Sequence, residues 1–164
     1  MNEAVEVRLR NGQVALVSRQ DAERVIAVEW KVNGKGYACQ KFRRDGGGHF
    51  ELSMHRFILG LPADGRLIVD HVNGNRLDNR RENLRICDKC QNGYNQGMQR
   101  TNTSGFKGVT KTKGGRWVVQ LRCAGRKVHV GSFDTAMEAA HAYNKAVVTL
   151  HGEFAVLNPI GENK

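Results

Sequence analysis

Apolar and polar residues alternate over the first twenty positions, on both sides of the dipeptide Asn11-Gly12. Alternation with a period of two is typical of strands, and Asn-Gly is a strong signal for a tight hairpin turn. We therefore predict two paired strands in this segment. Apolar residues at helical spacing then predict a short helix within residues 18–30. Clustered glycines bound two further strands, at residues 37–43 and 49–53.

A short apolar run, Leu67-Ile68-Val69, ends in the polar pair Asp70-His71. The run predicts a buried strand. Because consecutive strand residues point to opposite faces, the two polar side chains cannot be equivalent ligands on one surface. A carboxylate is a hard ligand for a divalent cation, and a neutral imidazole can deprotonate water. We therefore expect a metal ligand at Asp70 and a general base at His71.

The second half of the chain has a different pattern. Three stretches of alternating residues, 106–111, 116–123 and 127–133, are separated by glycine-containing turns. They predict a three-stranded antiparallel sheet with one apolar face and one basic face. Thr135 and Glu138 then form the signature of a capping box at the start of an amphipathic helix. We expect this helix to cover the apolar face of the sheet.

Charge is spread unevenly along the 164 residues. The formal net charge is +10, which indicates a polyanionic partner such as nucleic acid. Residues 89–133 contain no Asp or Glu. The nine basic residues of this stretch are Lys89, Arg100, Lys107, Lys111, Lys113, Arg116, Arg122, Arg126 and Lys127. The alternative is a basic soluble protein without a nucleic-acid partner.

Other classes of protein are disfavoured by what the sequence lacks. It has no run of eighteen apolar residues and no charged-then-apolar leader, so we expect no membrane partner and a cytoplasmic protein. Its four cysteines fit a reducing compartment. Cys87 and Cys90 form a lone CxxC pair, whereas a structural zinc site needs two more ligands. We expect unligated thiols; the alternative is a zinc-stabilised interaction module without catalysis.

Two asparagines extend the polar motif. Asn83 follows His71 by twelve residues, and Asn92 follows after nine more. With the surrounding string LDNRRENLRI, this pattern resembles the HNH nucleases, and most closely the phage and intron-encoded HNH homing endonucleases whose last histidine is an asparagine. The resemblance implies a ββα module around one divalent ion, Mg²⁺ or Mn²⁺, held by Asp70 and Asn92. It also implies that His71 is the general base, and that Asn83 braces the loop and orients the His71 ring.

Several basic residues accompany this motif. Four arginines occur within ten residues: Arg76, Arg80, Arg81 and Arg85. Guanidinium groups bind phosphates well, so we expect contacts with a DNA backbone; a solvated surface is the alternative. Upstream, His55 could line the site and touch the scissile phosphate, or it could be a packed or capping residue.

A second resemblance covers residues 104–158. The strings SGFKGV, RWVVQLR, VGSFDTAMEAAHAYNKA and HGEFAVLN are similar to the plant ethylene-response-factor (APETALA-type) DNA-binding domain, in which the exposed face of a three-stranded sheet enters the major groove. DNA contacts are therefore expected from the basic face. The residues concerned are Lys107, Thr110, Arg116, Gln120, Arg122, Lys127 and His129. Because four of them differ in type from the plant residues, base preference does not transfer, and contact with phosphates alone is the alternative.

Together these patterns predict an α+β chain. An N-terminal β-rich segment leads into a ββα-metal (HNH) module within residues 1–96, residues 97–104 form a linker, and residues 105–160 form a DNA-binding domain with a three-stranded sheet packed on one helix. We expect a monomeric, metal-dependent endonuclease of the homing type that nicks double-stranded DNA in a phage-infected or bacterial cell. The rival interpretation is a catalytically silent, sequence-specific DNA-binding protein or regulator.

Overall fold

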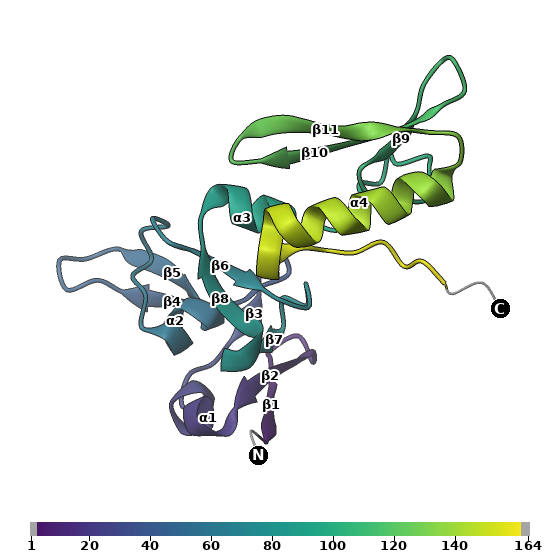
Figure 1. Cartoon of the computed structure of the whole chain (residues 1–164). Helices are drawn as coiled ribbons and strands as arrows, with labels where there is room; N and C mark the ends of the chain where they lie inside the picture. Colours follow the sequence, from purple (N-terminus) through teal and green to yellow (C-terminus); the bar gives the residue numbers. More distant parts are fainter. Residues whose placement is uncertain (1–2, 162–164) are drawn as a thin grey trace. The chain divides into compact units, whose positions relative to one another are not determined.

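The computed structural model describes residues 3–161, which fold into two compact units divided between Asp88 and Lys89 (Figure 1). Each unit has its own hydrophobic core. Small sheets and few helices occur throughout, so the predicted α+β class is confirmed. No helix in the described residues is long and apolar enough to cross a membrane.

The first unit opens with the predicted hairpin. Strands β1 (Ala4–Arg8) and β2 (Val14–Ser18) pair antiparallel, and Gly12 takes the positive φ of +83° that the turn requires. The other edge of β2 pairs in parallel with the short strand β7 (Asp78–Asn79). The hairpin therefore fixes the backbone of a segment far along the chain.

A helix and a second sheet complete the scaffold of the first unit. The helix predicted within residues 18–30 is present but shorter, as α1 (Arg19–Ile26). The elements that follow are β3 (Lys31–Val32), β4 (Ala38–Arg43), β5 (His49–Ser53) and α2 (Met54–Leu59). Strands β3, β4 and β5 pair antiparallel. The fully buried side chains of this unit include Val17, Val25, Trp30, Met54 and Ile58.

A two-stranded ribbon carries the polar motif. Strand β6 (Ile68–His71) pairs antiparallel with β8 (Leu84–Cys87), and a 3-10 turn, η1 (Arg81–Asn83), leads into β8. In the register of the ribbon, Asp70 lies opposite Arg85. The predicted strand at residues 67–69 is present but shifted: it begins at Ile68 and includes the polar pair, while Leu67 lies outside it and is 45% exposed.

The second unit is a sheet packed on a helix. Its elements are α3 (Lys89–Tyr94), β9 (Val109–Lys111), β10 (Trp117–Cys123), β11 (Arg126–Phe133), α4 (Ala136–His151) and η2 (Gly152–Phe154). The strand order is β11-β10-β9, all antiparallel. Helix α4 lies along this sheet (Figure 1) and begins with the predicted capping box of Thr135 and Glu138. Val119, Tyr143 and Val147 form the centre of the core.

Gly108 allows the helix to approach the sheet closely. A Cβ atom at this position would lie 2.3 Å from the ring of Tyr143, and φ is +74°, a value that disfavours any other residue. The ring of Tyr143 therefore packs directly on the backbone of Gly108.

Helix α3 belongs to the second unit, so that unit begins before the linker predicted at residues 97–104. Lys107 Nζ donates to the carbonyl oxygens of Tyr94 and Gln96 at 2.6 and 2.5 Å. The Tyr94 ring stacks on His151 with 3.8 Å between ring centroids. Residues 97–104 have no regular structure, but these contacts tie the segment before them to the sheet-and-helix unit.

Candidate functional site

The end of β6 places Asp70 and His71 next to each other, with only 6% and 4% of their surface exposed. Strand geometry directs the two side chains to opposite faces. Across the ribbon, Arg85 Nε and Nη2 donate to Asp70 Oδ2 at 2.9 and 2.7 Å. The Asp70 carboxylate therefore has a cationic partner. A divalent ion bound by Asp70 would share the carboxylate with the Arg85 guanidinium.

His71 is buried among aromatic rings and polar side chains. Its Nε2 lies 3.4 Å from Oδ1 of Asn79. Burial lowers the pKa of His71 below its usual value of 6.5, and the Asn79 contact and the charges of Asp70 and Asp78 offset this only in part. His71 is therefore neutral near pH 7, which is the form in which an imidazole accepts a proton.

A second histidine lies against the first. The rings of His55 and His71 meet edge to face, with centroids 5.2 Å apart and an interplanar angle of 90°. Tyr37 contacts both, at 5.3 Å from His55 and 5.8 Å from His71, and the Arg76 guanidinium lies 5.0 Å from the Tyr37 ring centroid. Burial, followed by the positive charges of His71 and Arg56, lowers the pKa of His55 to about 3. His55 is thus a packed, neutral side chain beside the candidate base.

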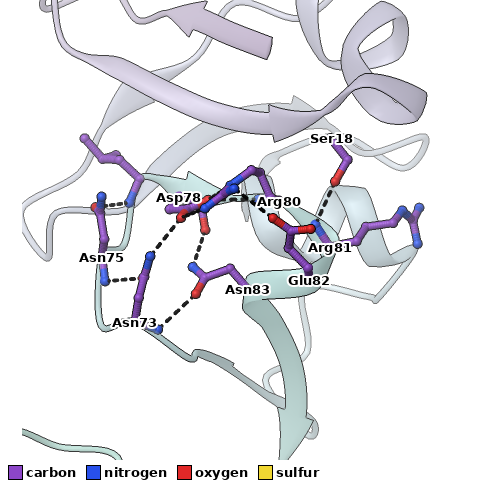
Figure 2. A network of polar contacts seen from close by, with 9 residues as sticks. Ser18, Asn73, Asn75, Asp78, Arg80, Arg81, Glu82 and Asn83 are labelled. Atoms are coloured by element: carbon purple, nitrogen blue, oxygen red, sulfur yellow. Dashed lines mark hydrogen bonds and ion pairs between the residues drawn. The ribbon is translucent and has the colours of Figure 1, made fainter. Parts of the chain in front are cut away.

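Asn83 spans the loop between the two strands of the ribbon (Figure 2). Its Oδ1 accepts from Asn73 N at 2.9 Å, and its Nδ2 donates to the carbonyl oxygen of Asp78 at 2.7 Å. These contacts suit the bracing role implied by the resemblance. A side-chain amide that lies close to the His71 ring belongs to Asn79, however, so the orienting role implied for Asn83 has a different candidate.

The arginines near the motif make ion pairs and hydrogen bonds within the first unit. Arg80 holds both oxygens of Asp78 at 2.8 Å (Figure 2), and Arg81 binds Asp21 at 2.7 Å. Arg85 binds Asp70, as described above. Arg76 is exposed and donates to a backbone carbonyl. Phosphate contact by these four residues stays a prediction.

The donor atoms expected for a metal ion are of the right chemistry. Asp70 and Asn92 supply carboxylate and amide oxygens, the ligand type that Mg²⁺ and Mn²⁺ prefer. Asn92 lies on α3, in the second unit, and is half-buried. Among residues 3–161, no group of three or more His, Cys, Asp or Glu side chains is arranged to hold a metal ion.

The predicted basic face of the second unit is formed by neighbouring strands. In the register of β10 and β11, Gln120 lies opposite His129, and Arg122 lies opposite Lys127. All four side chains are exposed. A hollow of about 480 Å³ is lined by five of the predicted DNA-binding residues together with parts of the segment 93–103. These five are Lys107, Thr110, Gln120, Arg122 and Lys127.

Two of the predicted contact residues have partners in the second unit. Lys107 Nζ caps carbonyls near the end of α3, and burial lowers the pKa of this amine. Arg116 donates to the Ser132 carbonyl at 2.9 Å and lies 3.4 Å from Asp134. The side chains of Gln120, Arg122 and Lys127 are the more direct candidates for contact with DNA.

Sequence reasoning did not find Asn79 or Asp78 as parts of the site. The Asp78 carboxylate accepts hydrogen bonds from Arg80 and from Asn73 Nδ2, and the Asn79 side chain contacts His71. Both residues reach this place because β7 pairs with β2, a contact between segments about sixty residues apart. No local pattern in the sequence predicts that pairing.

Comparison with known proteins gives the same two resemblances. The family model described as HNH endonuclease matches residues 59–94. An uncharacterized HNH endonuclease of Acanthamoeba polyphaga mimivirus is 30% identical over 153 residues, which cover 91% of this chain and 76% of that protein. Protein 3.8 of Escherichia phage T7 is 32% identical over 95 residues, which cover 57% of this chain and 78% of that protein.

The C-terminal part is similar to plant proteins. Dehydration-responsive element-binding protein 2A of Oryza sativa subsp. indica is 42% identical over 55 residues, which cover 32% of this chain and 20% of the rice protein. The chain therefore spans about a fifth of that relative. No solved structure matches the chain.

Proposed function

This chain belongs to the HNH endonuclease family, and we propose that it hydrolyses a phosphodiester bond in double-stranded DNA with His71 as the general base. The observation that carries the proposal is the setting of His71, which is buried, neutral and held by Asn79 beside the carboxylate of Asp70. A neutral imidazole in a fixed orientation can take a proton from water at pH 7.

In the proposed reaction, a proton of a water molecule passes to His71, and the water oxygen attacks the phosphorus in line with the 3′ oxygen. The bond between phosphorus and the 3′ oxygen breaks, and the leaving oxygen takes a proton from solvent. The products are a 5′ phosphate and a 3′ hydroxyl. Asp70 and Asn92 would hold one Mg²⁺ or Mn²⁺ ion, and such an ion would supply positive charge to offset the negative charge of the transition state. Asn83 keeps the loop between β6 and β8 in place through its two backbone contacts.

We further propose that the basic face of β10 and β11 docks on the duplex. Gln120, Arg122 and Lys127 are exposed on neighbouring strands and share one hollow. An amide can pair with adenine and a guanidinium with guanine in the major groove, while ammonium groups bind phosphates. With one His71 in the chain, one binding event cuts one strand, so the expected product is a nick.

The test is nicking of supercoiled plasmid at low salt with Mg²⁺ or Mn²⁺, with EDTA as the blank. We expect His71→Ala to lower the rate by about 10²- to 10⁴-fold, because the general base is lost. The matched control is His49→Ala, which removes an exposed histidine on β5 and should retain the wild-type rate.

Two results would contradict the proposal. Open-circle product formed equally fast by wild type and His71→Ala would remove His71 as the base. No product with either metal, from a protein that still shifts DNA in a gel, would favour the catalytically silent binding protein.

A further inference from the structure

Buried polar atoms without partners gather around the candidate base. Among the described residues, three buried side-chain nitrogens have no hydrogen-bond partner, and two of them belong to residues in contact with His71. These are Nδ1 of His55 and Nδ2 of Asn79. Burying an unpaired polar group destabilises the folded state, so such groups persist where another role outweighs the cost.

Asn79 is rigidly placed. It is 1% exposed, and its backbone is fixed by the parallel pairing of β7 with β2, in which Asn79 lies opposite Val17. Its amide side chain reaches His71 Nε2 at 3.4 Å. A buried amide on a paired strand has little freedom to move, so the imidazole edge that it contacts is held in a defined place.

The other side of the His71 ring is bounded by aromatic groups. His55, 7% exposed in the first turn of α2, meets it edge to face, and Tyr37 contacts both rings. The Arg76 guanidinium lies over Tyr37 and donates to the Lys35 carbonyl at 2.5 Å. The His55 and Tyr37 rings therefore restrict rotation of the His71 ring.

We infer that Asn79 and His55 are positioning residues for His71. Asn79 fixes the tautomer of the His71 imidazole and the position of its Nε2 edge, and the His55 ring fixes the orientation of the imidazole plane. This inference rests on the proposed function of His71. When Asn79 Oδ1 accepts the hydrogen of Nε2, the lone pair of the imidazole is on Nδ1, which is then the nitrogen that takes the proton from water. The orienting role thus passes from Asn83 to Asn79.

The first test is a double-mutant cycle on the single-turnover nicking rate. We expect Asn79→Ala to lower the rate by about 10- to 100-fold with unchanged DNA affinity, because small misplacements of a catalytic group cost that much. In a His71→Ala background the same substitution should cost nothing, since a positioning residue acts only through its partner. Asn75→Ala, an exposed asparagine in the same loop, is the matched control (Figure 2).

For His55 the expected pattern is a loss of at least tenfold in His55→Ala and recovery of most of that loss in His55→Phe, which keeps a ring at the contact. Equal losses in the two variants would show that the ring is not what positions His71, and would overturn that half of the inference. Circular dichroism and thermal unfolding identify any variant that loses its fold.

The second test does not depend on activity. Two-bond ¹H–¹⁵N correlation spectra at pH 7.5 report which ring nitrogen of His71 carries hydrogen. We expect the Nε2-protonated tautomer in the wild type and a mixture in Asn79→Ala. Protonation at Nδ1 in the wild type would overturn the role of Asn79.

Two outcomes separate the positioning role of Asn79 from the role of His71 as the base. If Asn79→Ala costs the same rate factor with and without His71, the positioning role is wrong while the nuclease stands. If His71→Ala nicks as fast as wild type, the proposed base itself is wrong.

Discussion

At the scale of single residues, the two touching histidines of the first unit have a shared consequence. Both rings are buried, and burial disfavours the charged form of each. A proton on His55 would also place a positive charge against His71. The arrangement therefore keeps the candidate base neutral near pH 7, but it makes the folded state sensitive to acid.

That sensitivity can be measured with His55→Phe. The pKa of His55 is near 6.5 unfolded and about 3 folded, so the unfolded state binds the proton first as the pH falls. The part of the free energy of unfolding that depends on neutral His55 is intact above pH 6.5 and is lost progressively below it. At pH 5 this loss is about 2 kcal/mol. Urea unfolding at pH 7.5 and pH 5 should show the variant losing that much less than the wild type.

The control for this comparison is His49→Phe, which replaces an exposed histidine on β5. It should follow the wild-type dependence on pH. If His55→Phe loses as much stability between pH 7.5 and pH 5 as the wild type does, then the acid sensitivity has another origin.

At the scale of elements, Arg81 joins three parts of the first unit. From η1, its guanidinium binds Asp21 on α1 and the carbonyl of Ile58 on α2, while its backbone N–H donates to Ser18 Oγ at 2.9 Å. Burial alone would raise the pKa of Asp21, but Arg81 and Arg24 hold it below its usual value. This buried carboxylate thus depends on Arg81 and Arg24 for its charge.

We expect Arg81→Ala to lower the free energy of unfolding by about 2–3 kcal/mol, because charge-assisted hydrogen bonds to a buried carboxylate are lost. Urea denaturation measures the change. Arg66→Ala is the matched control, since Arg66 pairs with Asp64 while 86% exposed, and surface pairs contribute at most about 1 kcal/mol. Equal effects of the two substitutions would contradict the structural role of Arg81.

The same elements show what the sequence could and could not predict. The hairpin at Asn11-Gly12, the strand ending at Asp70-His71 and the capping box at Thr135 depend on neighbours in sequence, and all three are present. The pairing of β2 with β7 joins distant segments, so Asn79 beside His71 was not predictable. The ion pairs of the arginines depend on folding as well, because sequence spacing does not show which carboxylate each one meets.

At the scale of the whole molecule, charge should govern how DNA binds. The chain has a net charge of +10, and residues 89–133 contribute no acidic side chain. Each phosphate neutralised by a basic side chain releases counterions, so affinity falls as salt rises. The basic face of β10 and β11 is where we expect this dependence to originate.

Lys127→Gln tests that expectation. The variant should bind DNA more weakly, and its plot of log affinity against log salt should be shallower by about 0.9, the share of one phosphate contact. Fluorescence anisotropy across a salt series measures the slope. Lys145→Gln on α4 removes the same charge from an exposed position on the helix rather than on the sheet, and should leave the slope closer to that of wild type. Matching slopes for the two variants would argue against binding through the basic face.

The separate cores of the two units determine where gene segments that encode such a chain could recombine without disrupting a core. Val17, Trp30 and Met54 belong to one core and Val119, Tyr143 and Val147 to the other, so recombination between the units leaves each core whole. Because Lys107 contacts Tyr94 and Gln96, the residues just before the predicted linker are tied to the second core. A gene fusion made within residues 97–104 would separate α3 from the sheet that anchors it, whereas one made at Asp88 would keep α3 with that sheet but part Asn92 from Asp70, the other proposed metal ligand.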